Sequence, residues 1–112
     1  MAGFVKGDVV VIPFPFSDLS AAKKRPALVL VGQKRDDIIL CQITSQNVKD
    51  DNAIPIELTD IENGTLNKKS NVRPNKIFTA DKNIVDYKVG NLNKIKTEAV
   101  IKSVVKMIEA YD

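Results

Sequence analysis

Residues 25–44 read RPALVLVGQKRDDIILCQIT, with two apolar runs on either side of a short polar turn. The first run, residues 27–31, is apolar throughout, which is typical of a strand buried on both faces. The second run, residues 38–44, has the length of a strand that returns beside it. Two such runs joined by a short turn predict an antiparallel hairpin.

The position of the turn decides which residues meet at the open end of this hairpin. If the turn is centred on residues 34 and 35, Arg25 pairs opposite Thr44. If it is centred one residue later, Arg25 lies opposite Gln46. In either register the guanidinium arrives beside Thr44, Ser45 and Gln46, and two more cations reach the same edge, Lys23 and Lys24.

These residue types suit a phosphate. Arginine offers a planar fork of donors to phosphate oxygens, and a hydroxyl adds a short hydrogen bond. The alternative is a basic loop followed by a strand-terminal threonine, with no chemical role for either. From the residues alone, the two interpretations have about equal weight.

Three further strands are predicted, at residues 8–12, 53–58 and 71–79. Pro55 cannot donate to a hydrogen-bond ladder, so its strand should lie at an edge of the sheet. Residues 15–26 and 59–70 are predicted loops, the second with a turn at Asn63 and Gly64.

One helix is predicted near the C-terminus, after a break at Gly90. Thr97 is a favourable N-cap, and Glu98 lies near the positive end of the helix dipole. Five apolar side chains at helical spacing predict its buried face: Val100, Ile101, Val104, Val105 and Ile108. Short strands followed by one amphipathic helix indicate a mainly β (α+β) fold with a strongly bent sheet or barrel.

The composition bounds the class of protein. A chain of 112 residues with 44% hydrophobic content fits one folded domain, residues 1–112. No apolar run is long enough to span a membrane, and the N-terminus lacks the blocks of a signal peptide. The single cysteine, Cys41, cannot form an internal disulfide and is expected in the core. A reducing, cytoplasmic location is expected.

Charge is distributed unevenly along the chain. The net charge of +3 divides into +4 over residues 1–35, −6 over residues 36–62 and +5 over residues 63–112. This layout suits a basic site for an anionic partner and a separate acidic surface. A solubilising mixture of surface charges is the alternative, and charge alone favours it.

The absence of histidine narrows the possible chemistry. It removes the usual acid–base side chain and the serine–histidine nucleophiles, and one cysteine is too few for a thiolate zinc site. An enzyme with this composition is expected to use no metal and no cofactor. RNA cleavage meets that condition, because the substrate's 2′-hydroxyl is the nucleophile and the protein need only position and stabilise the phosphodiester.

Several motifs resemble those of the MazF/PemK toxins of type II toxin–antitoxin systems. Residues 7–11 and 13–19, GDVVV and PFPFSDL, are similar to the opening of that family. KRPALVL at residues 24–30 and ITS at residues 43–45 follow in the same order, and the downstream matches are residues 70–77 and 89–92. Residues 17–24 contain no glycine, which resembles a PemK-like subgroup.

The resemblance implies a small SH3-like β-barrel with a C-terminal helix, assembled as a homodimer around a shared groove. It implies sequence-selective cleavage of single-stranded RNA, leaving a 2′,3′-cyclic phosphate and a 5′-hydroxyl. The family's catalytic arginine falls on Arg25 and its catalytic threonine on Thr44. It also implies a cognate antitoxin whose acidic, flexible C-terminal segment occupies the RNA groove.

We expect RNA contacts from eight further residues: Phe16, Asp18, Lys23, Lys24, Ser45, Gln46, Arg73 and Lys76. For Arg73 and Lys76, solvated charge on an edge strand is an equally good interpretation. Strand alternation puts Phe14 and Phe16 on the same side of the chain. Core packing is favoured for Phe14, whereas Phe16 either packs or stacks on a base.

Two other functions remain open. A gyrase inhibitor resembling CcdB would share the fold, but that type relies on a tryptophan near its C-terminus and this chain has no tryptophan. The other alternative is an RNA-binding barrel without turnover. The presence of both Arg25 and Thr44 favours the nuclease over that barrel.

Overall fold

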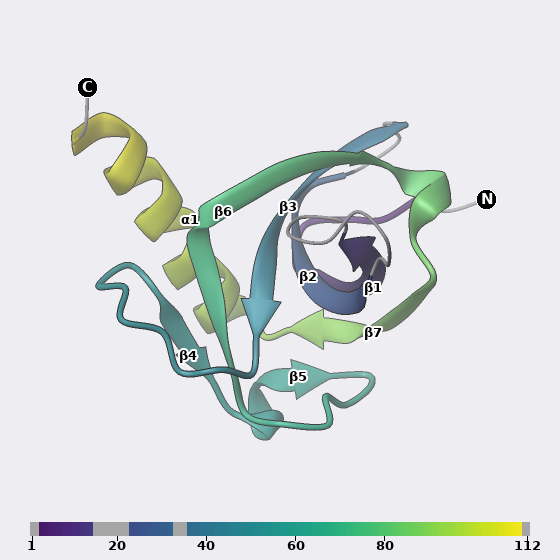
Figure 1. The fold of residues 1–112 in the computed structure, drawn as a ribbon, viewed down its shortest axis with the longest axis horizontal. Helices are drawn as coiled ribbons and strands as arrows, with labels where there is room; N and C mark the ends of the chain where they lie inside the picture. The colour runs from purple at the N-terminus through teal and green to yellow at the C-terminus, as the bar shows by residue number, and fades with distance from the viewer. Residues whose placement is uncertain (1–2, 15–22, 33–35, 111–112) are drawn as a thin grey trace.

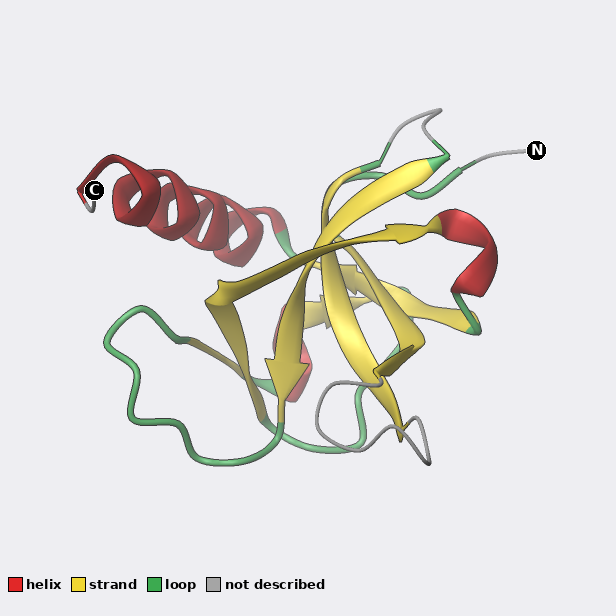
Figure 2. Ribbon diagram, turned by 45° about the horizontal axis from the view of Figure 1, so that its top comes forward, coloured by secondary structure: helices red, strands yellow, loops and turns green. Residues whose placement is uncertain are grey.

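The computed structural model describes residues 3–14, 23–32 and 36–110. It is an antiparallel sheet curled into a half-barrel, with one helix at its side (Figures 1 and 2). The fold therefore agrees with the predicted mainly β architecture. Its strands are β1 (Asp8–Phe14), β2 (Lys23–Val31), β3 (Asp37–Thr44), β4 (Ile54–Ile56), β5 (Ile61–Glu62), β6 (Ser70–Asp81) and β7 (Tyr87–Leu92), and its helices are η1 (Leu58–Asp60), η2 (Lys82–Ile84) and α1 (Lys94–Ala110).

The strands follow the order β4-β6-β3-β2-β1-β7-β5, so β2 lies near the middle and β4 and β5 form the edges. The edge position predicted for the strand of Pro55 is confirmed, because β4 pairs only with β6. Long β6 crosses the top of the view in Figure 1 and closes one side of the half-barrel.

The hairpin predicted at residues 25–44 is formed by β2 and β3. Ala27 pairs with Gln42 and Leu28 with Cys41. Continued by two residues, this register sets Arg25 level with Thr44, as in the first of the two registers considered. Nearer the turn the register shifts by one residue, because Val31 pairs with Ile39. Arg25 and Thr44 therefore lie on the same face of the sheet, because opposite residues of paired strands share a face.

The central part of the sheet is buried on both faces. Along β2, Leu28 and Leu30 belong to one core, which α1 and β4 cover, and Ala27 and Val29 belong to a second core on the opposite face. This explains why residues 27–30 are apolar at every position rather than at alternate ones, whereas Val31, at the end of the run, is exposed. The thiol of Cys41 is fully buried in the first core, as predicted.

The start of β1 shows what the GDV motif does. Gly7 has φ +97°, a conformation that strongly favours glycine. The next carboxylate, Asp8, is 3% exposed. It accepts a 2.9 Å hydrogen bond from the Val5 N–H and lies 3.1 Å from Nζ of Lys88. The motif therefore anchors the entry of β1 to β7.

The predictions for Gly90 and for residues 59–70 were incomplete. Gly90 does not break the chain but lies inside β7, and β5 occupies part of the predicted loop. A Cβ on Gly90 would lie 2.6 Å from the carbonyl oxygen of Glu62. Glycine is required there because β5 and β7 approach closely, so the residue permits strand pairing.

The predicted N-cap of the helix was wrong. Helix α1 begins at Lys94, and Asn93 caps it by accepting a 2.8 Å hydrogen bond from the Lys96 N–H. Thr97 is buried in the first turn, where its hydroxyl donates to the Leu92 carbonyl at 3.2 Å. Asparagine and threonine are both favourable N-caps, but only Asn93 lies at the start of the helix, whereas Thr97 is buried within its first turn.

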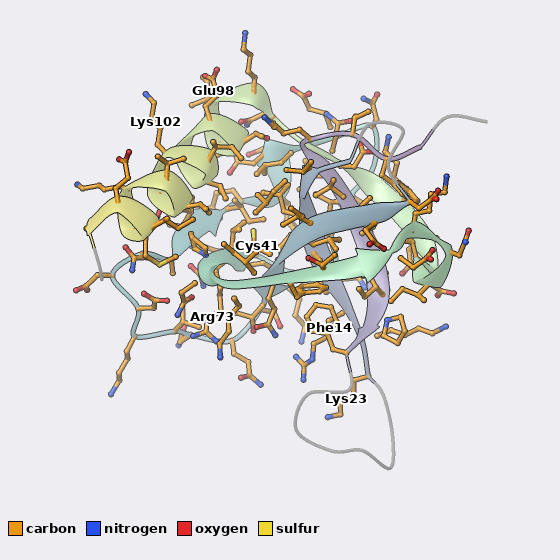
Figure 3. All side chains as sticks on the ribbon, turned by 90° about the horizontal axis from the view of Figure 1, so that it is seen from above. Phe14, Lys23, Cys41, Arg73, Glu98 and Lys102 are labelled. Atoms are coloured by element: carbon orange, nitrogen blue, oxygen red, sulfur yellow. The ribbon has the colours of Figure 1, made fainter. Side chains whose placement is uncertain are left out.

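The buried face of α1 is narrower than predicted. Val100 and Val104 are buried, whereas Val105 and Ile108 are exposed. Figure 3 shows Glu98 and Lys102 on the outward side of the helix. Across the described ranges, no helix is long and apolar enough to span a membrane.

Candidate functional site

A cavity of about 660 Å³ opens at the end of the central strands. One wall is the sheet where β1, β2 and β3 meet the start of β7, and the facing wall is the segment between β5 and β6. Its lining residues are Val11, Lys24, Arg25, Pro26, Ile43, Thr44, Ser45, Gly64, Thr65, Leu66, Asn67, Lys68, Ser70, Tyr87, Lys88 and Val89. A pocket of this size fits a small ligand or part of a polymer.

Arg25 and Thr44 border the same cavity. Arg25 is partly buried, and among the residues that the structure describes it makes no ion pair. Thr44 is 7% exposed, and its hydroxyl oxygen accepts a hydrogen bond from the Gln46 N–H at 3.2 Å. The two polar groups predicted to meet at the end of the hairpin are thus next to one open space.

Four side chains from adjacent strands form an apolar row along the sheet wall. Val11 pairs with Pro26 on one side and with Tyr87 on the other. The register of β2 with β3 places Ile43 level with Pro26. All four residues line the cavity, so one wall offers a continuous apolar surface.

The charged groups of the cavity are mostly positive. Lys24, Lys68 and Lys88 line it together with Arg25. Two of these cations are paired, because Nζ of Lys24 lies 2.9 Å from Asp86 and that of Lys88 lies 3.1 Å from Asp8. The remaining positive charge favours an anionic ligand.

Of the other predicted RNA contacts, Lys24 and Ser45 line the cavity. Lys23 and Gln46 are exposed just outside the lining. Arg73 and Lys76 lie on β6, with Arg73 level with Gln42 of β3. In Figure 3, Arg73, Phe14 and Lys23 lie on the side of β6 away from α1. Phe16 and Asp18 lie outside the described residues.

Phe14 is a core residue, which confirms the core packing favoured for it from the sequence. It is 5% exposed, and its ring meets that of Phe78 edge to face with centroids 4.9 Å apart. This ring is therefore not available to a base.

The wall formed by residues 64–68 and by the start of β7 was not predicted from the sequence. The turn at Asn63 and Gly64 was recognised, but nothing local indicated that β5 pairs with β7 and so places this segment over the strand ends. The exposed aromatic Tyr87 was missed for the same reason. The positive charge of residues 63–112 was the only available signal.

The metal-ligating residue types are dispersed. Within the described ranges, no three His, Cys, Asp or Glu side chains gather as a metal site would require. Burial raises the pKa of the Cys41 thiol to about 12, so at neutral pH this group is neither a nucleophile nor a thiolate ligand.

The fold is shared with solved toxin structures. The chain superposes on an endoribonuclease in complex with its cognate antitoxin from a mycobacterial species with a TM-score of 0.75, at 10% identity over 97% of this chain and 98% of that one. For the Mycobacterium tuberculosis toxin MazF-mt6 the TM-score is 0.70, at 16% identity over 91% and 96%.

A third similar structure is the MazE–MazF complex of Deinococcus radiodurans, with a TM-score of 0.74 at 13% identity over 95% of this chain and 96% of that one. Because these identities are low, the superpositions establish the fold alone. A search of curated protein sequences finds no match. The family model for PemK-like, MazF-like toxins matches residues 5–108, and the chain therefore belongs to the PemK-like, MazF-like toxins of type II toxin–antitoxin systems.

Proposed function

We propose that this protein is a toxin endoribonuclease that cleaves single-stranded RNA, including mRNA, at a short sequence and without a metal. The observation that carries the proposal is that Arg25 and Thr44 border one cavity. The register of β2 with β3, continued by two residues, supports it by setting the two residues level on adjacent strands. Family membership and the endoribonucleases among the similar structures support the same reaction.

In the proposed reaction, the 2′-hydroxyl of one nucleotide attacks the adjacent phosphorus. The new O2′–P bond replaces the P–O5′ bond, and the products carry a 2′,3′-cyclic phosphate and a 5′-hydroxyl. The proton lost by the 2′-oxygen passes to solvent, and the departing 5′-oxygen gains one. The protein needs no nucleophile of its own, which fits a chain without histidine.

Arg25 is the electrostatic stabiliser in this scheme. A guanidinium stays protonated near pH 7, so it is suited to binding the charged phosphate oxygens rather than to acting as a base. If it also donates the proton that the leaving 5′-oxygen gains, it regains a proton from solvent. Its partial burial strengthens the interaction, because fewer water molecules compete for the phosphate.

Thr44 orients the phosphate. Its oxygen already accepts the Gln46 N–H, so its own proton is directed elsewhere and is available to a phosphate oxygen. Lys24, Lys68 and Lys88 add positive charge to the cavity through which the RNA strand is proposed to pass. Ser45 is a further proposed contact inside the cavity, and Lys23, Gln46, Arg73 and Lys76 are proposed to extend the contacts beyond it. Phe16 and Asp18 are also proposed to contact RNA.

The partner and assembly follow from the family. We infer a cognate antitoxin whose acidic, flexible C-terminal segment competes with RNA for the basic cavity, and a homodimer acting in the cytoplasm. Two of the similar structures are complexes of a toxin with its antitoxin, which supports the first inference.

The test is incubation of the purified protein with single-stranded RNA in excess EDTA, followed by mapping and mass analysis of the ends. Discrete cuts with cyclic phosphate and 5′-hydroxyl ends are expected. Intact RNA, whether bound tightly or not, would contradict the proposal. Tight binding without products would instead support the non-catalytic RNA-binding barrel.

A further inference from the structure

We propose that Tyr87 is a stacking platform for the base of a nucleotide next to the scissile phosphate, and so helps to determine sequence preference. The inference rests on the proposed ribonuclease function. It concerns a residue outside the set predicted to contact RNA.

Tyr87 differs from the other aromatic side chains of the described ranges. Phe14 is buried, and Phe4 and Phe78 are partly buried against the second core. Tyr87 is 56% exposed and lines the cavity. Bases of single-stranded nucleic acids stack on exposed aromatic rings, and this interaction accepts any base to some degree.

The backbone around Tyr87 is held on both sides. The N–H of Asp86 donates to the carbonyl of Val11 at 2.8 Å, and Tyr87 itself pairs with Val11 in the ladder between β1 and β7. Lys88 reaches the buried carboxylate of Asp8 at 3.1 Å. The tyrosine is thus fixed in position by its neighbours while most of its own surface is open, which lowers the ordering cost of binding a base.

The geometry relates this ring to the proposed reaction. Tyr87 is the end of the apolar row that runs through Val11 to Pro26, the residue directly after Arg25. Two strand spacings separate Tyr87 from Pro26, about 10 Å. Arg25 alternates with Pro26 along β2 but borders the same cavity as Tyr87, so a nucleotide whose phosphate is held by Arg25 can place its base within this cavity against the ring.

The facing wall supplies groups that could read the stacked base. Thr65 and Asn67 line the cavity from the segment between β5 and β6, and both side chains are exposed. An amide and a hydroxyl can both donate and accept hydrogen bonds, as the edge of a nucleobase requires. Stacking on Tyr87 would present that edge to them.

The experiment measures kcat/KM on an oligoribonucleotide spanning a mapped cut site, with wild-type protein and three variants. Tyr87→Ala is expected to lose roughly five- to a hundredfold, as expected for one lost base stack, and Tyr87→Phe is expected to retain most activity. Ile84→Ala is the matched control, since Ile84 is an exposed apolar residue outside the cavity. Circular dichroism verifies that each variant is folded.

Substrates lacking the base at each nucleotide flanking the cut then locate the contact. At one position, removal of the base should lower kcat/KM of the wild type to that of Tyr87→Ala. The two proteins should then no longer differ, because the stacking interaction is already absent from the substrate. An equal penalty on every abasic substrate, or no penalty for Tyr87→Ala, would overturn the stacking role while leaving the ribonuclease standing. Failure of the wild type to cut any RNA would overturn both.

Discussion

Nζ of Lys24 lies 2.9 Å from Oδ2 of Asp86, and this ion pair joins β2 to the segment that enters β7 at the rim of the cavity. Both side chains are substantially exposed, at 62% and 38%. Exposed pairs contribute little to stability, so the main effect of Asp86 is to offset one of the cavity's cations.

Replacing Asp86 with Asn should therefore strengthen RNA binding without unfolding the protein. We expect tighter binding by less than about fivefold at low salt, and a shift of the unfolding free energy within about 1 kcal/mol. The gain should shrink as salt rises, because the added contact is electrostatic. Anisotropy with a 2′-O-methylated RNA, which is not cleaved, measures the affinity.

Asp36→Asn is the matched control for this variant. Asp36 pairs with Lys82 at 3.5 Å outside the cavity lining, so its replacement adds the same net charge at another place. An equal gain from both variants would show that net charge alone is responsible, and would contradict the local explanation.

Arg25→Ala should keep the fold and lose catalysis. Loss of one charge-stabilising contact commonly costs about 10²–10³ in rate. Arg25→Lys should recover only part of this, since an ammonium lacks the planar fork of donors. Lys102→Ala, on the outward side of α1, controls for the loss of a cation. Wild-type cleavage by folded Arg25→Ala would refute the assignment of the catalytic group.

Thr44 is tested by a pair of variants that separate the hydroxyl from the methyl group. Thr44→Ser keeps the hydroxyl and should remain active. Thr44→Val removes it, and we expect a loss of about ten- to a hundredfold in kcat with a smaller change in KM, as for an interaction made mainly in the transition state. Because the Gln46 N–H loses its hydrogen-bond acceptor in Thr44→Val, the free energy of unfolding should fall by roughly 1 kcal/mol. Equal rates for the two variants would remove Thr44 from the mechanism.

The parts of this site that could be predicted from the sequence are those that depend on short-range pairing. Residues 25–44 contain both strands and their turn, so the apolar runs alone were enough to bring Arg25 beside Thr44. The register remained ambiguous by one turn position, and the structure selects the alternative with Arg25 and Thr44 level.

The opposite wall depends on contacts between distant parts of the chain. Ile61 pairs with Leu92, and neither flanking segment shows the alternation of a half-buried strand. Gly90 was interpreted as a break because the close approach of Glu62, which requires glycine, is a tertiary feature. Tyr87 and Asn67 could therefore not be assigned to the cavity before the fold was known.

Gly64 provides a test of how that wall is held. A Cβ at this position would clash with the carbonyl oxygen of Val89 in β7. Gly64→Ala should push the segment at residues 64–68 away from β7, lower stability by about 1–3 kcal/mol and weaken RNA binding. Chemical denaturation and anisotropy measure the two effects. Lys69→Ala, directly after this segment and exposed, should change stability by less than about 1 kcal/mol. A matching loss of stability in both variants would argue against the steric cause.

Cys41 gives a pH-dependent prediction for the core. Burial raises the pKa of its thiol from 9.0 to about 12, so the folded protein holds this proton more tightly than the unfolded chain does. The resulting stabilisation is complete below pH 9 and is lost as the pH rises from 9 toward 12, by at most about 1.4 kcal/mol per pH unit. Lysine and tyrosine residues titrate in the same range, so the measurement is the difference in unfolding free energy between wild type and Cys41→Ala. That difference in unfolding free energy should narrow steadily above pH 9, because only the wild type loses the stabilisation that comes from its protonated thiol. A constant difference up to pH 12 would mean that the thiol has the same pKa in the folded and unfolded states.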